Sequence, residues 1–591
     1  MSGRFHDFYN AELTALRRRA GRFAASYPKL AGRLRLAPDT ADDPHVERLI
    51  QSFAYTAARV RQKLDDSLPE LTDSLLETLY PHYLAPTPAM TVLAFTPDAG
   101  LDVATTVPRG TEVASETIDN DRVRFATTQD VPLAPLRIEG LRMMARPFDA
   151  PPGPKAARAC LRISLRTTNG ASLQDIDLKT LRLYLSGPGQ EAPALARLLL
   201  QHHLGSALAQ HADDPDPLEI APTALWPIGF DPDTALLPYP KGTFRGYRML
   251  TEFAVLPEKF LYFDLALPPL PTRPAAELFL YFDAPADETL RGIGVEALTL
   301  HATPAINLFP TRTEPVPFDG TRTAYPLQAD ARRPRTRLVH SVRRVTLTHA
   351  DGTDEVCPPF FHRLTDHRSD GVFWQLQRTS EAEGHAPGAT SIAFVDHRNR
   401  ATVRRDSTAS VEVLATNGTL AGRLPFGGGQ PRLSLVSALD AVAGIACLRA
   451  PTTHRGPAAD ADRAWSLISH LSLNHLSLDA AGAPALRDIL RLYDPGDGPE
   501  MAQMIDAIDV LETNSGLGRV DGVTVTGTDV LLTFDDSRIS AAQAVFFGAV
   551  IDRFLGCYTT INTFTRLTLR MKNRTDTLAR FEARAGEEAL I

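Results

Sequence analysis

Two helical repeats of hydrophobic residues near the start of the chain constrain the fold most strongly. In each repeat, apolar residues recur at alternating spacings of three and four, which is the pattern of a narrow seam between packed helices. The pattern therefore predicts two amphipathic helices of equal length, each with its seam packed against another apolar surface. The seam residues are Tyr9, Leu13, Leu16, Ala20, Phe23 and Tyr27 in the first helix, and Val46, Ile50, Phe53, Ala57, Val60 and Leu64 in the second.

The start of the second helix and a third helical segment can also be located. Asp43 stands where an N-terminal cap is expected, and Pro44 and Glu47 follow in the first turn. A third amphipathic segment runs from Pro69 to Tyr80 and ends before Pro81. Aromatic residues at both ends of the first seam favour a bundle that also takes helices from other chains, while a self-contained N-terminal cap is the alternative. The predicted partner-binding residues are Tyr9, Leu13, Leu16, Phe23, Ile50, Phe53, Val60 and Leu64.

The remainder of the chain predicts an α+β protein of several domains. From about Thr91 the hydrophobic period changes from helical to alternating, and short strands follow one another with turn signals between them. One helical insert is expected between Glu191 and Leu204. We expect a helical segment at residues 1–90, a β-rich domain with the helical insert at 91–300, a second β-rich domain at 301–455 and a C-terminal domain at 456–591.

After the first helices, the C-terminal domain has the clearest pattern of predicted strands and helices. Ala464–Leu478 alternates like a strand, a helix is expected from Pro484, and two further strands precede a capping box formed by Ser540 and Gln543. A closing strand is expected from Ile561. This β-α-β-β-α-β order predicts a ferredoxin-like α+β fold.

Composition excludes several classes of function. The 591 residues carry 62 basic and 70 acidic side chains, so the net charge of −8 does not favour binding to nucleic acid. The four cysteines have no metal or redox spacing, and no stretch is apolar for long enough to span a membrane. Because the N-terminus is polar from Arg4 onward, we expect a cytoplasmic protein that is not inserted directly into a membrane.

Candidate catalytic and metal sites are weak. Gly427–Gly429 has no lysine and no following helix, so it predicts a turn and not a phosphate-binding loop. His362, Asp366 and His367 form the best metal-like group, and a metal-dependent hydrolase that uses them is one alternative function. A carbohydrate-binding β-module protein is another, although only three tryptophans are present. Neither a cofactor nor a catalytic residue is predicted.

A family resemblance covers both ends of the chain. The stretch from Phe8 to Met90, which begins FYNAELTALRRRAGRFAASYPKL, resembles the opening of the TssF (ImpG/VasA) family of the type VI secretion baseplate. ATPAINLFP from Ala302, RLPFGGG from Arg423 and CYTTINTFTRL from Cys557 are similar to the same family. VPRGTEV, followed by RFATTQDVPLAPL, also resembles the β-domain of contractile-phage wedge subunits.

The resemblance implies a structural scaffold and not an enzyme. Two TssF-like copies would join one TssG to form a wedge, and wedges would ring the VgrG hub and nucleate the contractile sheath and tube. TssK would link the wedge to the membrane complex, and TssE is a further implied partner. We therefore expect a cytoplasmic protein that is associated with the membrane complex through the assembled baseplate.

Overall fold

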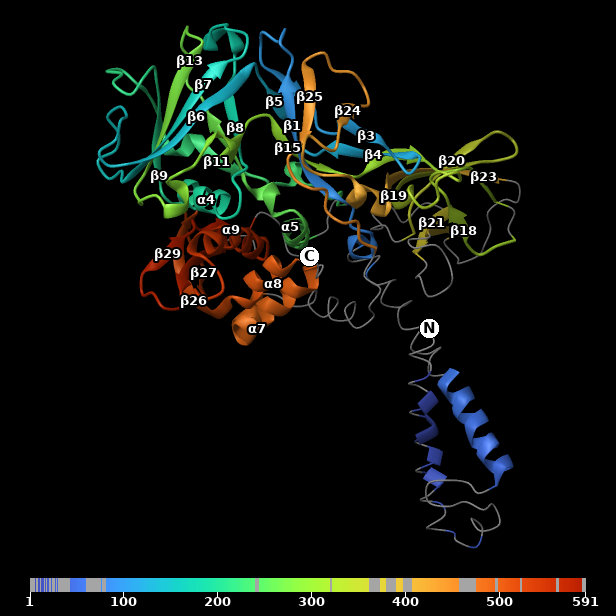
Figure 1. Ribbon diagram of the computed structural model, residues 1–591. Coiled ribbons are helices and arrows are strands. Elements are labelled where there is room, and N and C mark those ends of the chain that lie inside the picture. The colour runs from blue at the N-terminus through green and yellow to red at the C-terminus, as the bar shows by residue number, and fades with distance from the viewer. Residues whose placement is uncertain are drawn as a thin grey trace.

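The computed structural model shows a body of β-sheets from which the first helices project (Figure 1). The described helical residues between His6 and Phe23 and those at 44–59 form two segments that stand side by side, away from the body. Leu76, in the third predicted helix, is helical and buried in the main hydrophobic core, and the other residues of this predicted helix lie outside the described residues. The structure describes residues 43–59, 76, 81–239, 244–318, 321–360, 372–378, 390–396, 407–456, 475–494, 498–520, 523–559 and 563–586, and scattered positions from 6 to 29.

The central sheet joins three distant parts of the chain. Its strand order is β24-β3-β4-β15-β1-β25, and β1 pairs antiparallel with both β15 and β25. The sheet therefore runs across the predicted domain boundary at residue 300, and the division into domains remains a prediction. The strands are β1 (Met90–Pro97), β3 (Glu112–Ile118), β4 (Asp121–Thr127), β15 (Ala302–Ile306), β24 (Leu433–Leu435) and β25 (Val442–Cys447).

Two further sheets and two helices enclose the main core. One sheet has the order β10-β9-β13-β7-β6, and the other has the order β11-β12-β8-β14. The predicted helical insert is present as α4 (Glu191–Gln201), and α5 (Arg245–Val255) packs beside it against the C-terminal module. The strands are β6 (Leu136–Ala145), β7 (Ala159–Thr167), β8 (Thr180–Leu185), β9 (His203–Ala209), β10 (Leu218–Ile220), β11 (Leu225–Ile228), β12 (Tyr262–Ala266), β13 (Ala275–Phe282), β14 (Leu298–Thr299) and a separate pair β2 (Thr105–Val107) and β5 (Val131–Leu133).

Residues 309–416 form a lobe with its own hydrophobic core. The chain enters the lobe after Asn307 and leaves it at Asn417, where the Asn307 amide Nδ2 donates to Asn417 Oδ1 at 2.8 Å. Both asparagines are buried, so the two crossings are fixed to each other. The sheets have the orders β16-β23-β19-β20 (with β17 on β23) and β18-β22-β21. Their strands are β16 (Phe309–Arg312), β17 (Val316–Phe318), β18 (Tyr325–Leu327), β19 (Leu338–Thr348), β20 (Asp354–Cys357), β21 (Val372–Arg378), β22 (Thr390–Asp396) and β23 (Ser407–Thr416).

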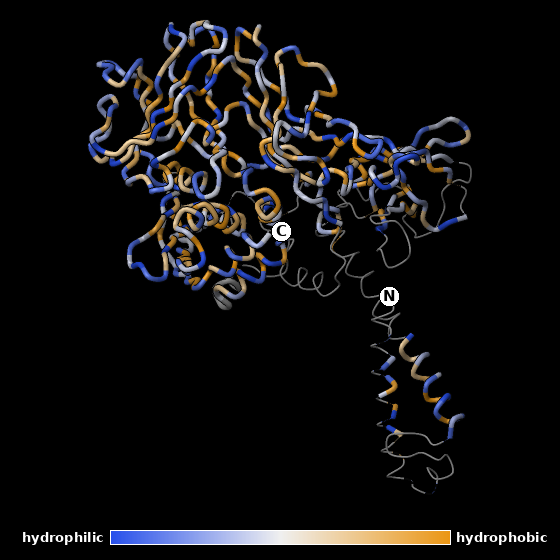
Figure 2. The backbone as a smooth tube through the Cα atoms, in the orientation of Figure 1, coloured by the Kyte–Doolittle hydropathy of each residue, from blue (hydrophilic) through white to orange (hydrophobic). Residues whose placement is uncertain are grey.

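The C-terminal module confirms the α+β class but differs from the expected order. The predicted capping box is present: Ser540 opens α9 (Ala541–Cys557), which is buried along most of its length and strongly hydrophobic (Figure 2). The other elements are α7 (His475–Tyr493), α8 (Pro499–Asp506), β26 (Ile508–Val520), β27 (Val523–Phe534), β28 (Phe564–Met571), β29 (Thr577–Arg580) and β30 (Arg584–Ala585).

The prediction of a ferredoxin-like arrangement is wrong for the described residues of this module. His475–Leu478, the end of the first predicted strand, belongs to helix α7, and residues 464–474 lie outside the described residues. The sheet order is β26-β27-β28-β29, and β27 pairs directly and in parallel with β28. A ferredoxin-like sheet would place a strand from the start of the module between these two. Alternation of leucine and serine in a short segment did not distinguish strand from helix.

Candidate interaction surface on the N-terminal helices

An ion pair joins the two projecting helices, and a hydrogen bond within the second helix holds its carboxylate in place. Arg17 Nη2 of the first helix donates to Glu47 Oε1 of the second at 2.5 Å, and Gln51 Nε2 donates to the same oxygen at 3.2 Å. The second helix begins as predicted, because the His45 backbone N–H donates to Asp43 Oδ1 at 2.9 Å. The pair is therefore a defined helical hairpin.

The buried face of the second helix is a stripe of small and polar residues. Ala54 and Ala58 are fully buried, and Glu47 and Gln51 are half-buried. These four positions follow a spacing of four, three and four, so they lie on one face of the helix. Short side chains allow two helix backbones to approach closely, which accounts for the burial of this stripe in the hairpin.

The hydrophobic seam of the second helix lies beside this stripe. Val46, Ile50, Phe53 and Ala57 each precede a residue of the buried stripe by one position, which corresponds to a rotation of about 100° around the helix. Val46, Ile50 and Ala57 are half-buried, whereas Phe53 is 64% exposed. The sequence thus located the seam correctly on a helix, but its apolar centre is not covered by the hairpin.

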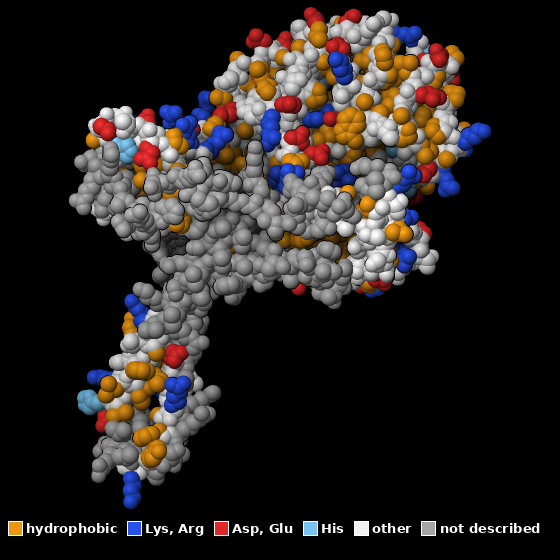
Figure 3. Space-filling view, turned by 180° about the vertical axis from the view of Figure 1, so that it is seen from behind, with side chains coloured by type: hydrophobic (Ala, Val, Ile, Leu, Met, Phe, Trp, Pro, Cys, Tyr) orange, Lys and Arg blue, Asp and Glu red, His pale blue; other side chains and the backbone are white. Residues whose placement is uncertain are grey.

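Other large hydrophobic residues on the hairpin are also exposed. Leu49 is 70% exposed, and Phe23 and Tyr27 are exposed with their ring centroids 5.3 Å apart. In Figure 3 hydrophobic side chains are visible along the projecting hairpin, interspersed with basic ones. We define the outer face as Phe23, Tyr27, Leu49 and Phe53. Isolated exposed apolar residues are ordinary, but several on one projecting element mark an interaction surface.

The other predicted partner-binding residues have mixed outcomes in the structure. Tyr9, Leu13 and Leu16 are helical and half-buried, as is Ile50. Val60 and Leu64 lie outside the described residues. Partner binding by all eight residues remains a prediction. Leu49 was missed because it lies outside the strict three-and-four spacing, and its position one turn before Phe53 was the available signal.

The metal-like candidates do not gain support. His362, Asp366 and His367 lie outside the described residues. Within the described ranges, no group of three histidine, cysteine or acidic residues is arranged to hold a metal ion. Among the described histidines, His202 Nδ1 contacts Asp283 Oδ1 at 2.8 Å, and burial lowers the pKa of the neighbouring His203 to about 4. Gly427–Gly429 forms the predicted turn, with positive φ at all three glycines.

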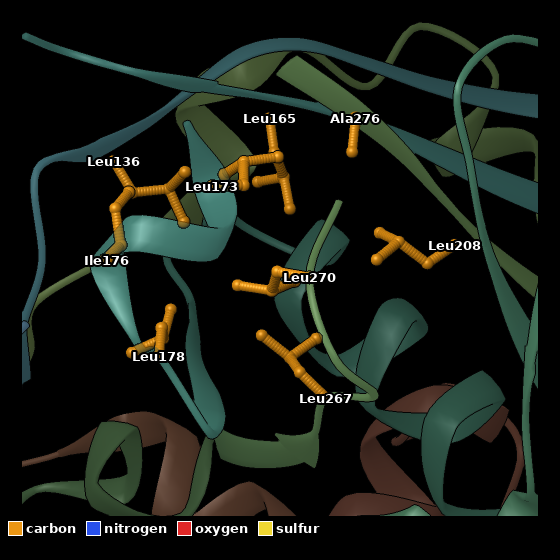
Figure 4. A pocket seen from close by; sticks show the side chains of 9 residues that line it. All are labelled: Leu136, Leu165, Leu173, Ile176, Leu178, Leu208, Leu267, Leu270 and Ala276. Atoms are coloured by element: carbon orange, nitrogen blue, oxygen red, sulfur yellow. The ribbon is translucent and has the colours of Figure 1, made fainter. Parts of the chain in front are cut away.

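A small pocket in the body is purely apolar. Figure 4 shows side chains from opposite walls pointing toward one another, including Leu165, Leu208 and Leu270. All nine lining residues are leucine, isoleucine or alanine, so their side chains offer no hydrogen bond to a polar ligand. This pocket is a packing gap in the core and has no side chain capable of acid–base or nucleophilic chemistry.

Residues 332–337 form a basic run, RRPRTR, that pairs partly within the chain. Arg333 and Arg337 both bind the buried carboxylate of Asp121, which the sequence did not identify as their partner. Arg332 and Arg335 are exposed. The run is therefore in part a structural contact between the central sheet and the lobe.

Across the described residues, no helix is long and apolar enough to cross a membrane.

Comparison with known proteins gives one consistent family. The family model described as "Type VI secretion system, TssF" matches residues 1–588. The type VI secretion system component TssF1 of Pseudomonas aeruginosa PAO1 is 33% identical over 99% of both chains. A chain in the solved TssK-TssF-TssG baseplate subcomplex is 26% identical, with a TM-score of 0.72 over 92% of this chain and 100% of that chain. A chain of the type VI baseplate complex, 24% identical, has the same fold with a TM-score of 0.59 over 98% of this chain and 100% of that chain.

Proposed function

Because this chain belongs to the TssF family of the type VI secretion system, we propose that its outer face on the N-terminal helices joins it to other subunits of the secretion baseplate. The observation that carries this proposal is the exposure of Leu49 and Phe53 beside, and not within, the contact between the two helices. Full burial of side chains of this size contributes about 1.5–3 kcal/mol each, so a partner that covers both gains substantial binding energy.

The proposed assembly contains two copies of this chain and one TssG. Its helices and those of TssG form a shared bundle, and the resulting wedges ring the VgrG hub and nucleate the sheath and tube. TssK connects the wedge to the membrane complex, and TssE binds the assembled baseplate. The occurrence of a structurally similar chain together with TssK and TssG in a solved subcomplex supports the choice of these partners. In this role the chain is a cytoplasmic scaffold and performs no catalytic step.

Large interfaces suit this role. A ring that withstands contraction needs extensive, well-packed contacts, and obligate interfaces are rich in apolar area. Helices from several chains can bury both the seams and the outer face at once, because Phe23, Tyr27 and Phe53 of the outer face are themselves seam residues. The hairpin is separate from the body, so partners can surround it (Figure 1).

Substitution of Phe53 tests the proposal directly. Phe53→Asp places a charge on the outer face, and because Phe53 is 64% exposed the hairpin itself loses little packing. We expect this variant, alone or with Leu16→Asp, to lose co-purification with TssG while the folded body is retained by circular dichroism.

Tyr55→Asp is the matched control. Tyr55 is 49% exposed on the same helix and lies two residues, or about 200°, away from Phe53. The control is expected to co-purify with TssG as the wild type does. Retention of TssG by Phe53→Asp, or equal loss by both variants, would count against the outer face as the binding surface.

A further inference from the structure

The edge strand of the C-terminal sheet is long and only partly covered. β26 has thirteen residues and, among the described strands, pairs with β27 alone (Figure 1). Thr513, Ser515 and Leu517 make no hydrogen bond outside this pairing within the described part of the chain. Free backbone N–H and C=O groups along such an edge can accept another strand.

Helix α7 covers the first part of the edge. Arg487 Nη1 donates to the carbonyl oxygen of Ile508 at 3.3 Å. Gly482 lies against Leu511, where an added Cβ would be 3.7 Å from the carbonyl oxygen. Leu486 and Leu490 of α7 belong to the same hydrophobic core as Ile508 and Leu511. The accessible part of the edge therefore begins at about Glu512.

The rest of the β26–β27 hairpin extends beyond its neighbour but is packed against the body at its base. β28 pairs with β27 only from Gly527 onward, so Leu517–Val520 and Val523–Thr526 project past it. The buried ring of Phe564 fills the space above Gly518 and Gly527, where added Cβ atoms would lie 2.6 and 2.4 Å from ring carbons. The ring of Phe564 therefore ties the base of the projecting hairpin to the body.

The projecting edge has few of the devices that usually prevent strand pairing, because its only charged residues, Glu512 and Arg519, lie at its two ends. Between Glu512 and Arg519 the sequence ETNSGLGR contains neither proline nor lysine. Leu517 in this segment is 69% exposed. A long open edge with an exposed leucine is a site for association through an added strand.

We propose that this edge pairs antiparallel with the same edge of a second copy, with Leu517 opposite its symmetry mate. The inference rests on the proposed function for the presence of a second copy. In this register Asn514 lies opposite Val520, Ser515 opposite Arg519 and Gly516 opposite Gly518. No like charges are directly opposite each other, and the two exposed leucines cover one another on the two-fold axis.

Helix α7 selects this register. With Leu517 on the axis, Val520 at the end of β26 of the second copy lies opposite Asn514, within the open part of the edge. A register shifted by four residues, with Ser515 on the axis, would bring Val520 opposite Val510 and Arg519 opposite Leu511, where Gly482 of α7 lies. The length of open edge therefore matches one pairing that also joins the leucines.

Disulfide trapping of the full-length chain tests the register. Directly opposite residues on antiparallel strands have Cα atoms about 4.5–5.5 Å apart, within the range of a disulfide bond. Leu517→Cys is therefore expected to form a covalent dimer under mild oxidation, seen on a non-reducing gel above the background of the wild type with its four cysteines.

Ser515→Cys is the matched control because it is exposed on the same strand. In the proposed register the two copies of residue 515 are offset by four residues, or about 13 Å, which a disulfide cannot span. The control should give wild-type background, whereas Ser515→Cys combined with Arg519→Cys should crosslink. Absence of the Leu517→Cys dimer, or an equal dimer from Ser515→Cys alone, would overturn the proposal.

A second variant tests self-association through the β26 edge without a crosslink. Leu517→Lys places a charge on the axis and should weaken self-association of the full-length chain by about tenfold or more in analytical ultracentrifugation, because two buried leucines are lost. Wild-type self-association in this variant would contradict the proposal. Binding of TssG tests the helical hairpin separately, so each proposal can fail while the other holds.

Discussion

At the scale of single residues, Asp121 joins the lobe to the central sheet. Its buried carboxylate accepts hydrogen bonds from Arg337 Nε at 2.9 Å and Nη2 at 2.5 Å, and from Thr336 Oγ1 at 2.9 Å. Arg337 is itself buried and lies over the ring of Phe309. Removing one charge of such a pair leaves the other buried without compensation. Asp121 therefore fixes the lobe to the body.

Asp121→Asn should lower the free energy of unfolding by about 3–5 kcal/mol. The control is Asp119→Asn, because Asp119 and its partner Arg423 are both largely exposed, 2.5 Å apart, and exposed pairs contribute about 0–1 kcal/mol. Chemical denaturation monitored by tryptophan fluorescence, to which Trp374 of the lobe contributes, compares the two. Equal losses in the two variants would show that the buried pair does not fix the lobe.

His301 should make the stability depend on pH. Burial lowers the pKa of His301 from 6.5 to about 4, and its Nε2 accepts the Ala134 N–H at 3.3 Å. Because the folded pKa is below the unfolded one, the unfolded state binds the proton first. Stability is therefore complete above about pH 6.5 and is lost as the pH falls toward 4, by about 3 kcal/mol.

His301→Gln tests this assignment. Glutamine keeps an acceptor at a similar reach but cannot be protonated, so the loss of stability between pH 6.5 and 4 should be smaller by about that amount. Unfolding midpoints measured across this range give the slope for both proteins. An unchanged slope would mean that His301 does not titrate as its burial indicates.

At the scale of elements, the spacing of hydrophobic residues predicted where helices form better than it predicted which face of a helix makes contacts. The spacing from Val46 to Ala57 identified a helix, but the stripe that packs in the hairpin contains Ala54 and Ala58, one position away. The spacing pattern identifies residues only by their hydrophobicity, whereas close contact between two helices favours short side chains. The sequence therefore indicated which residues are apolar but not which of them the chain covers by itself.

The C-terminal module shows a second limit of local pattern. The capping box at Ser540 was predicted because its signal is confined to four residues. The alternation in LSLNHLSL predicted a strand, but its last residues are helical in α7. Leucines at 473 and 476 also match a helical spacing of three, so the short segment is consistent with both structures.

At the scale of the whole molecule, the central sheet could not be derived from sequence. Short alternating segments predicted strands throughout the β-rich region, but β1 pairs with strands that begin more than two hundred and three hundred residues later. Such pairing depends on long-range contacts that leave no local pattern. The same limit applies to Asp121 and Arg337, which are far apart in sequence and adjacent in the fold.

The helical hairpin has an apolar outer face that is exposed in the single chain, and we propose that other subunits cover it in the assembly. This arrangement explains why the chain combines a large, fully formed core with exposed Phe53 and Leu49 on a projecting element. Obligate assemblies commonly complete such surfaces with a partner. The two-fold pairing proposed for β26 would add a separate contact, between copies of the chain.

The rate of thiol labelling at position 53 tests this claim most directly. A Phe53→Cys variant of the full-length chain should react quickly with a thiol reagent when free and at least about tenfold more slowly with TssG bound, because the partner excludes the reagent. Tyr55→Cys, on the other side of the helix, should react quickly in both states. Equal labelling of Phe53→Cys with and without bound TssG would contradict the account.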